Sequence, residues 1–380
     1  MWVRTRPGRF ILARTARVGI IGNGGFTHFL LDSWREIPDL EVTAISARNE
    51  ERLRETAERH GIPGVYAGGD GWRRMLAEAP VDLVAVVTPP SLHAEMSIAA
   101  IEAGKAVLCE KPLATTVEDA EAIAEASHRK GVPVSINYVM RYNPLFHAIK
   151  SVIDERVLGE AHRVDFTNLA SDEGLPPDHW FWDIEQSGGI LVEHGVHFFD
   201  VYTWLLGSKA ADVQGYRTVR PGTTQEDRVM ASVRYESGAL GTFYHAFDRP
   251  SRLERQRALI TFDQGTIEVD GWIAIRASVD AAVSDDQARR LRQLLPPGGP
   301  VDEQIYGDGE HQAQGGGNDY RFDRRLRYDS VFCKDQGTMY AQNVRDALMD
   351  LVAAMHDPAH AIRADLEAGL SSLRIACAVK

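Results

Sequence analysis

The stretch Val18-Gly19-Ile20-Ile21-Gly22-Asn23-Gly24-Gly25-Phe26-Thr27 decides the fold of this chain. Apolar residues run directly into a cluster of glycines, and an amphipathic segment then continues to Trp34. This order predicts a buried strand, a tight turn and a helix. Such a turn lets the backbone approach a pyrophosphate at the helix N-terminus. The candidate cofactor-binding residues of the turn are Gly22, Gly24, Gly25 and Phe26.

The glycine cluster is an incomplete dinucleotide fingerprint, because Thr27 stands where the third glycine is usual. The glycine cluster alone therefore does not establish a nucleotide site, and the pattern of strands and helices around it has to support one. Strand and helix patterns alternate from the glycine cluster to about residue 140, and 81–87 is a nearly continuous apolar run typical of a strand covered on both faces. We expect a Rossmann domain with a doubly wound parallel sheet over 17–140.

Composition limits the classes of function. With 380 residues, 44% of them hydrophobic, the chain can bury two substantial cores. A net charge of −12 argues against a nucleic-acid surface or a polybasic membrane patch. Three cysteines form no disulfide framework, which favours a reducing compartment, and no apolar run approaches the roughly 20 residues of a spanning helix.

The first 16 residues are rich in arginine and contain no acid. Their only apolar run, 10–13, is too short for the core of a signal peptide. We expect a disordered extension without a catalytic role, and a cytoplasmic protein.

Longer alternating segments replace the βα pattern after residue 140. They predict an α+β domain over 141–380 with a mostly antiparallel open sheet. Proline-rich and glycine-rich stretches bracket a loop-rich insertion expected at about 280–330. The predicted strands are 161–169, 227–235, 240–247, 257–262, 266–269 and 273–279, and the predicted helices are 143–156, 195–206 and 338–356.

Ser46-Ala47-Arg48 closes the second predicted strand, about 20 residues after the glycines. An acid here would bind a ribose 2′-hydroxyl, and Ala47 cannot. Ser46 and Arg48 are candidates to hold a 2′-phosphate, since a guanidinium matches phosphate geometry. This favours NADP slightly over NAD. Arg48 can equally be a solvated loop arginine or stack on adenine.

Cys109-Glu110-Lys111-Pro112 ends another predicted strand. Together with the glycine turn and Thr88-Pro89-Pro90, it resembles the Gfo/Idh/MocA oxidoreductases, the relatives of glucose–fructose oxidoreductase and inositol dehydrogenase. The resemblance implies that Lys111 is a catalytic lysine at the nicotinamide and the substrate. It also implies a cofactor site that contains Thr88, Pro89, His93, Glu110 and Lys111.

The segment 188–200 resembles the family's catalytic region, which has two glycines, an acid and a histidine four residues later. On that mapping His197 is the catalytic histidine, and Glu193 stands where Asp is usual, which adds one methylene. Two other interpretations stay open: Glu193, His194 and His197 as metal ligands, or a purely structural histidine. Asp200 follows and can orient His197 or simply be a helix residue.

Candidate substrate-binding residues lie around these motifs. Aromatic faces pack against the apolar faces of sugar rings, and core packing or subunit contact explains the tryptophans equally well. The candidates are Asn137, Arg141, Trp180, Trp182, Glu193 and His194.

The resemblance implies an oxidoreductase that uses NADP or NAD and moves a hydride between nicotinamide and a secondary alcohol or ketone of a sugar, cyclitol or sugar derivative. It also implies a homodimer or homotetramer formed through the C-terminal sheet. The alternatives are a glycosidase that acts through transient oxidation and a regulator that senses the dinucleotide without turnover.

Overall fold

The computed structural model describes residues 3–4, 10–11, 16–307 and 311–379. The arginine-rich extension expected at 1–16 therefore lies almost entirely outside the described residues. The chain divides into two compact units. The first contains 1–142, 179–197 and 340–377, and the second contains 143–178, 198–339 and 378–380. Two later segments, 179–197 and 340–377, thus belong to the first unit, whereas consecutive domains were expected.

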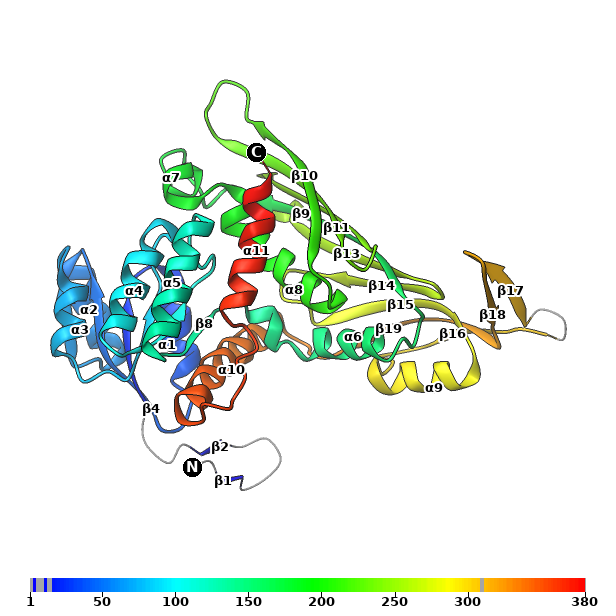
Figure 1. Cartoon of the computed structure of the whole chain (residues 1–380), viewed down its shortest axis with the longest axis horizontal. Coiled ribbons are helices and arrows are strands. Elements are labelled where there is room, and N and C mark those ends of the chain that lie inside the picture. Colours follow the sequence, from blue (N-terminus) through cyan, green and yellow to red (C-terminus); the bar gives the residue numbers. More distant parts are fainter. Residues whose placement is uncertain (1–2, 5–9, 12–15, 308–310, 380) are drawn as a thin grey trace. The chain divides into compact units, whose positions relative to one another are not determined.

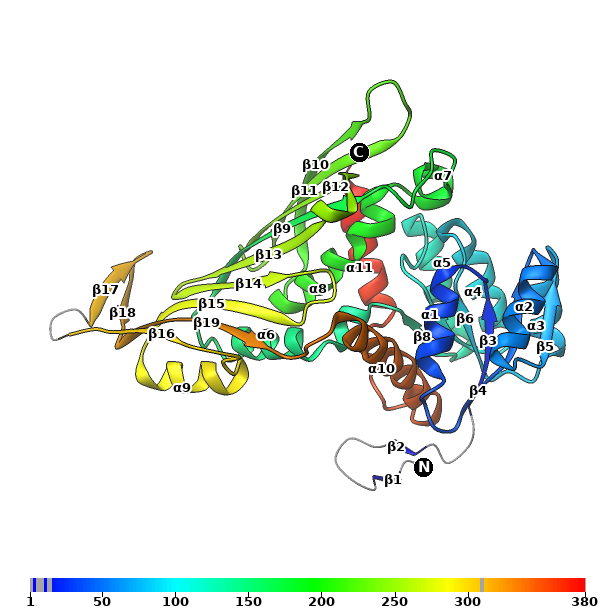
Figure 2. The ribbon, with the colours of Figure 1, turned by 180° about the vertical axis from the view of Figure 1, so that it is seen from behind.

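The first unit contains a six-stranded, wholly parallel sheet in the order β5-β4-β3-β6-β7-β8. All residues of β6 and β7 are buried, as expected for strands covered on both faces. Helices lie on both faces: α4 and α5 are nearest the viewer in Figure 1, and α1 in Figure 2. The strands are β3 (Ala16–Ile21), β4 (Leu40–Ala47), β5 (Gly64–Ala67), β6 (Leu83–Val86), β7 (Ala106–Cys109) and β8 (Val134–Ile136).

The parallel βα alternation predicted from the sequence is confirmed. Side chains at the N-caps begin two of the helices, because Asn49 accepts from the N–H of Arg52 and Thr116 from that of Asp119. The helices are α1 (Gly25–Trp34), α2 (Glu50–His60), α3 (Gly71–Glu78), η1 (Pro90–Leu92), α4 (His93–Glu102), α5 (Val117–Lys130) and η2 (Val139–Tyr142). Later segments add η3 (Trp180–Trp182), α7 (Ile184–Ser187), η4 (Leu191–Gly195), α10 (Gln336–His356) and α11 (Leu366–Ala378).

The second unit contains a nine-stranded sheet in the order β10-β11-β12-β9-β13-β14-β15-β19-β16. Only the β12–β9 pair is parallel, so the mostly antiparallel sheet predicted from the sequence is confirmed. The strands are β9 (Ala161–Ser171), β10 (Ala210–Val219), β11 (Glu226–Tyr235), β12 (Leu240–Arg249), β13 (Arg255–Phe262), β14 (Gly265–Asp270), β15 (Arg276–Val283), β16 (Asp302–Ile305) and β19 (Arg324–Val331).

One face of this sheet forms the core of the second unit. Burial alternates along β11 and β15, and α6 (Pro144–Asp154) and α9 (Asp285–Leu294) lie on one side of the sheet (Figures 1 and 2). Phe166 of β9 stacks on Phe198 of α8 (Val196–Leu206), with 3.8 Å between the ring centroids. The opposite face leaves large apolar side chains such as Tyr216 and Leu240 exposed.

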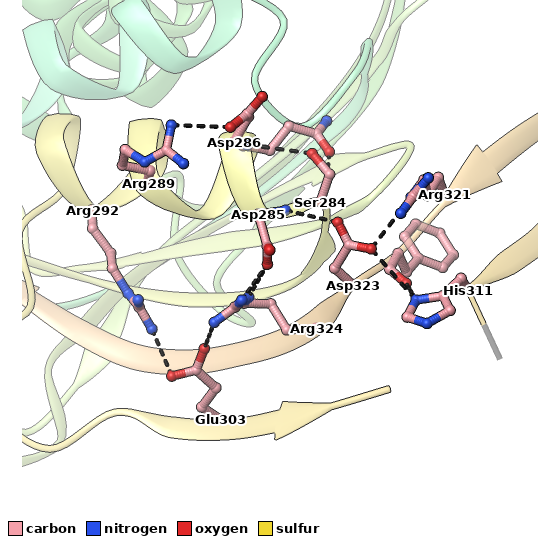
Figure 3. Close-up of polar contacts among 12 residues, drawn as sticks. Ser284, Asp285, Asp286, Arg289, Arg292, Glu303, His311, Arg321, Asp323 and Arg324 are labelled. Atoms are coloured by element: carbon pink, nitrogen blue, oxygen red, sulfur yellow. Dashed lines mark hydrogen bonds and ion pairs between the residues drawn. The ribbon is translucent and has the colours of Figure 1, made fainter. Parts of the chain in front are cut away.

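The loop-rich insertion expected at 280–330 is wrong. This segment forms α9, β16 and β19, together with the hairpin of β17 (Gln312–Gly315) and β18 (Asn318–Arg321). Charge pairing holds it, since Arg324 bridges Asp285 and Glu303, and Arg292 donates to Glu303 at 2.9 Å (Figure 3). The charged partners lie far apart in sequence and form no local pattern. Local signals for regular structure were nevertheless present, since Ser284 and Gln287 form a capping box at the start of α9 and buried residues alternate along β19.

Two glycines of the turn, Gly22 and Gly25, differ in whether the fold requires a glycine there. Gly22 has φ +124°, and an added Cβ would lie 1.9 Å from the carbonyl oxygen of Val87. A Cβ added to Gly25 would meet nothing within 4 Å. We expect Gly22→Ala to lower the free energy of unfolding by about 3 kcal/mol or more, and Gly25→Ala to change it by less than about 1 kcal/mol. Urea denaturation of both variants measures this, and equal stabilities would contradict it.

Candidate active site

The glycine turn joins β3 to α1 at the carboxyl end of the parallel sheet, where doubly wound folds bind ligands. The N–H of Gly22 donates to the carbonyl of Ser46 at 2.8 Å, which fixes the turn against β4. Gly24 and Gly25 are exposed, and no side chain caps α1. Because a Cβ at either position would meet nothing within 4 Å, the fold itself does not require glycine there. Their small size leaves the first N–H groups of α1 open to an anion.

An aromatic cluster adjoins this turn. The ring of Phe26 lies 5.8 Å from that of Phe29 and 6.0 Å from that of Tyr340, and Phe29 and Tyr340 are 4.6 Å apart. Burial and the Glu110 carboxylate raise the pKa of the Tyr340 phenol. Tyr340 could not be predicted from the sequence, because no local pattern links α10 to a turn more than 300 residues earlier.

Ser46 and Arg48 take different positions at the end of β4. Ser46 is buried, and its hydroxyl donates to the carbonyl of Tyr66 at 2.8 Å. That bond commits the hydroxyl to the packing of β4 on β5, so the position of Ser46 does not support the predicted phosphate contact. Arg48 is exposed just beyond β4 and is left as the candidate.

His93 is not at the surface of the site, as a direct cofactor contact would require. The residue is fully buried at the start of α4. Its Nδ1 lies 2.7 Å from the carbonyl oxygen of Pro112, and its Nε2 lies 2.9 Å from that of Thr88. The ring thus lies between the loop after β6, which also contains Pro89, and the loop after β7. This position does not support the expected direct contact of His93 with the cofactor.

Lys111 follows β7, and its peptide bond to Pro112 is cis. The ammonium donates to the backbone carbonyl of Glu193 at 2.8 Å and forms an ion pair with the Glu193 carboxylate. Both side chains are largely withdrawn from water, at 15% and 13% exposure. A charge in such a place needs a partner, and Glu193 supplies two acceptors.

Glu193 and His194 lie in η4, which is a π-helical turn, and α8 continues directly from it. The sequence analysis placed the start of this helix at 195, so the π-helical part was missed. Such turns are rare and occur often at functional sites, because they displace the helical hydrogen bonds. Here the carbonyl of Glu193 accepts from Lys111.

Two histidines, His194 and His197, follow Glu193 closely in the sequence. His197, on the first turn of α8, is 5% exposed, and its ring centroid lies 6.1 Å from that of His194 and 6.1 Å from that of Tyr138. Burial and the positive charge of Lys111 lower the pKa of His194 to about 3, so that ring is neutral.

A second carboxylate completes the charged cluster. Withdrawal from water raises the pKa of Glu110 to about 7, although hydrogen bonds from Asn137 and the charge of Lys111 oppose the shift. The side-chain amide of Asn137 donates to Glu110 at 2.5 Å. Two carboxylates therefore lie near one ammonium.

The remaining predicted residues lie elsewhere in the first unit. The Arg141 guanidinium donates to the carbonyl of Arg363 at 3.1 Å, which ties it to the segment between α10 and α11. Trp180 and Trp182 are half-buried in η3. The structure thus brings together Lys111, Glu193, His194, Glu110 and Asn137.

The described residues also bear on two other interpretations, a metal site and a helix that spans a membrane. Among the described residues, no group of three or more His, Cys, Asp or Glu side chains has an arrangement that could hold a metal ion. In the same part of the chain, no helix combines the length and apolar character needed to cross a membrane.

Two family models match consecutive parts of the chain. Residues 16–138 match the family model described as "Oxidoreductase family, NAD-binding Rossmann fold". Residues 146–268 match the "GFO/IDH/MocA C-terminal domain". The chain also resembles the solved structure of a levoglucosan dehydrogenase in complex with NADH, with a TM-score of 0.75, 22% identity and 96% of each chain covered.

Two curated proteins illustrate the similarity in sequence. The myo-inositol 2-dehydrogenase of Thermotoga maritima is 28% identical over 262 residues, which are 67% of this chain and 72% of that protein. An uncharacterized oxidoreductase of Bacillus subtilis, YrbE, is 27% identical over 227 residues, 58% of this chain. That match spans 64% of the Bacillus protein, slightly less than two thirds of its length.

The raised pKa of Glu110 predicts a pH dependence of stability. The ordinary value is 4.5, and the folded value is about 7, so the folded state holds a proton that the unfolded chain releases. The free energy of unfolding should therefore fall as pH rises from about 4.5 to about 7, by about 3 kcal/mol at most. We expect Glu110→Gln to remove this part of the pH dependence.

The measurement compares denaturant unfolding of wild type and Glu110→Gln between pH 4.5 and 8. Glu125→Gln, on the exposed side of α5, is the matched control and should follow wild type at every pH. A constant difference between wild type and Glu110→Gln across the range would contradict the shift.

Proposed function

This chain belongs to the Gfo/Idh/MocA family of oxidoreductases, and from that premise we propose that it is an NAD(P)-dependent dehydrogenase or reductase. Its substrate is a secondary alcohol or ketone of a sugar, cyclitol or sugar derivative, the class to which the inositol and levoglucosan in its relatives' names belong. The glycosidase and the dinucleotide sensor are not favoured by these names.

The observation that supports this proposal best is the pairing of Lys111 with Glu193 beside His194 and close in sequence to His197. The pair lies in the unit that also contains the glycine turn and the parallel sheet. An ammonium, a carboxylate and an imidazole are the groups that a hydroxyl or carbonyl needs for hydrogen bonding and proton transfer.

The residues of the glycine turn fit a dinucleotide. Gly24 and Gly25 would hold the pyrophosphate with the open N–H groups of α1. The buried Thr88 hydroxyl has no hydrogen-bond partner among the described residues and is available for one more hydrogen bond. A bound nicotinamide cofactor supplies the hydride chemistry, while the protein supplies position and proton transfer.

In the direction of oxidation, Lys111 donates a hydrogen bond to the substrate hydroxyl oxygen and stabilises the negative charge that develops there. His197 accepts the proton of that hydroxyl. Glu193 orients Lys111 through its carboxylate and its carbonyl. In the reverse direction the same proton returns to the carbonyl oxygen.

The finer choice of cofactor rests on the end of β4. Ala47 carries no carboxylate to accept from a 2′-hydroxyl or repel a 2′-phosphate, and the exposed Arg48 follows it. We infer a preference for NADP over NAD, with Arg48 as the phosphate ligand.

Assembly and compartment follow from other parts of the chain. The uncovered face of the nine-stranded sheet exposes Tyr216, Val219 and Leu240, and we propose that it joins copies into a homodimer or homotetramer. All three cysteines are free, which suits the reducing cytoplasm.

We expect Lys111→Ala and His197→Ala to lower kcat by about 10²–10⁴-fold each, because each removes one group of the proton path. NADH should still bind to both. Absorbance of NAD(P)H across a panel of sugars and cyclitols measures turnover. The control variants Lys334→Ala and His128→Ala change the same residue types at the surface and should match wild type. Turnover near wild type in either test variant removes that residue from the mechanism.

We also expect wild type to bind NADPH about 10- to 150-fold more tightly than NADH, the range given by one charge-assisted contact. Arg48→Ala should remove most of this difference and leave NADH binding unchanged. Arg59→Ala, which removes an exposed positive charge from α2, controls for net charge. Tighter binding of NADH that persists in Arg48→Ala would exclude the proposed preference.

A further inference from the structure

His93 lies between two carbonyl oxygens and has too few protons for both. Its Nδ1 is 2.7 Å from the Pro112 oxygen, and its Nε2 is 2.9 Å from the Thr88 oxygen. Both oxygens are acceptors, while a neutral imidazole carries a single N–H. A neutral ring can therefore satisfy only one of the two carbonyls.

The charge of the His93 ring decides whether it donates one hydrogen bond or two. An imidazolium would donate to both oxygens, and the carbonyls and Glu193 favour that form. Complete burial, together with the positive charge of Lys111, opposes it more strongly, and the net effect lowers the pKa of His93. The ring is thus neutral, and one of its two contacts is a hydrogen bond.

The geometry points to His93 as a positioning residue that donates from Nδ1 to the Pro112 carbonyl and thereby holds the loop of Lys111 in place. This inference rests on the proposed function. The contact to Pro112 is the shorter of the two, and Pro112 directly follows the lysine whose ammonium reaches Glu193. His93 itself touches neither cofactor nor substrate in this role.

The size of the expected rate loss follows from how precisely the reaction needs Lys111 to be positioned. Without the donor, the buried Pro112 carbonyl loses its partner, and the loop can shift. A displacement of about 1 Å at a reacting group costs on the order of 10²-fold in rate. The loss should appear in kcat, since the glycine turn and Arg48 do not depend on this loop.

Two substitutions of His93 distinguish the roles of its two ring nitrogens. The amide nitrogen of Asn can occupy nearly the place of Nδ1, and that of Gln nearly the place of Nε2. We expect His93→Gln and His93→Ala to lower kcat about 100-fold, and His93→Asn to stay within about tenfold of wild type. The Kd for NADH should change by less than about threefold in each. Ser97→Ala, one turn along the same buried face of α4, is the control and should match wild type.

The tautomer is measured directly in the wild-type protein by ¹⁵N NMR of labelled histidine. We expect a neutral ring with its proton on Nδ1, and this readout needs neither turnover nor a folded alanine variant. A proton on Nε2, an imidazolium, or equal rates in the Asn and Gln variants overturns the proposal. Weakened NADH binding with normal kcat also overturns it, because His93 would then act on the cofactor. If wild type turns over no sugar or cyclitol, the proposed function fails, while the NMR result still decides the role of His93.

Discussion

The ammonium of Lys111, held by both the carbonyl and the carboxylate of Glu193, is the interaction around which the site is built. A lysine withdrawn from water requires a matching charge, and the adjacent Glu110, whose own pKa is raised to about 7, does not supply a firm one. The partner comes from residue 193, which belongs to the same unit as the parallel sheet although the intervening strand β9 does not. The π-helical turn directs the Glu193 carbonyl at the ammonium, so the local irregularity of the helix and the placement of the lysine depend on each other.

The surroundings of the Lys111–Glu193 pair set the protonation of the neighbouring groups. Glu110 lies close enough to take part, yet its pKa is raised to about 7 because it is withdrawn from water. His194 stays neutral because burial and Lys111 both lower its pKa. A site with one firm ion pair, one carboxyl near its titration point and one neutral imidazole can change its protonation at little cost, which suits the reversible transfer of a single proton.

The glycine turn shows how one motif serves two demands. Gly22 is required by the fold, because its backbone has a positive φ and the Val87 carbonyl leaves no room for a Cβ. Gly24 and Gly25 face open space, so the fold itself requires glycine at neither position, and their lack of side chains fits the proposed pyrophosphate site. The buried His93 likewise belongs to the support of the site, since it links the loops after β6 and β7.

The parallel sheet and most strands of the antiparallel sheet could be predicted from the sequence, because periodic burial leaves its mark on local composition: the apolar run at 81–87 contains the buried β6, and the alternating 227–235 matches β11. The strands β10, β16 and β19 were not predicted. The Glu-Lys-Pro motif also identified Lys111 as a candidate catalytic residue, through its resemblance to the family. Only the tertiary structure decided which polar groups meet, because partners such as Glu193, Tyr340 and the hydrogen-bonded Ser46 hydroxyl are set by packing between distant segments. The 280–330 segment shows the same limit, since the pairing of Arg324 with Asp285 and Glu303 depends on distance in space, which no local pattern records.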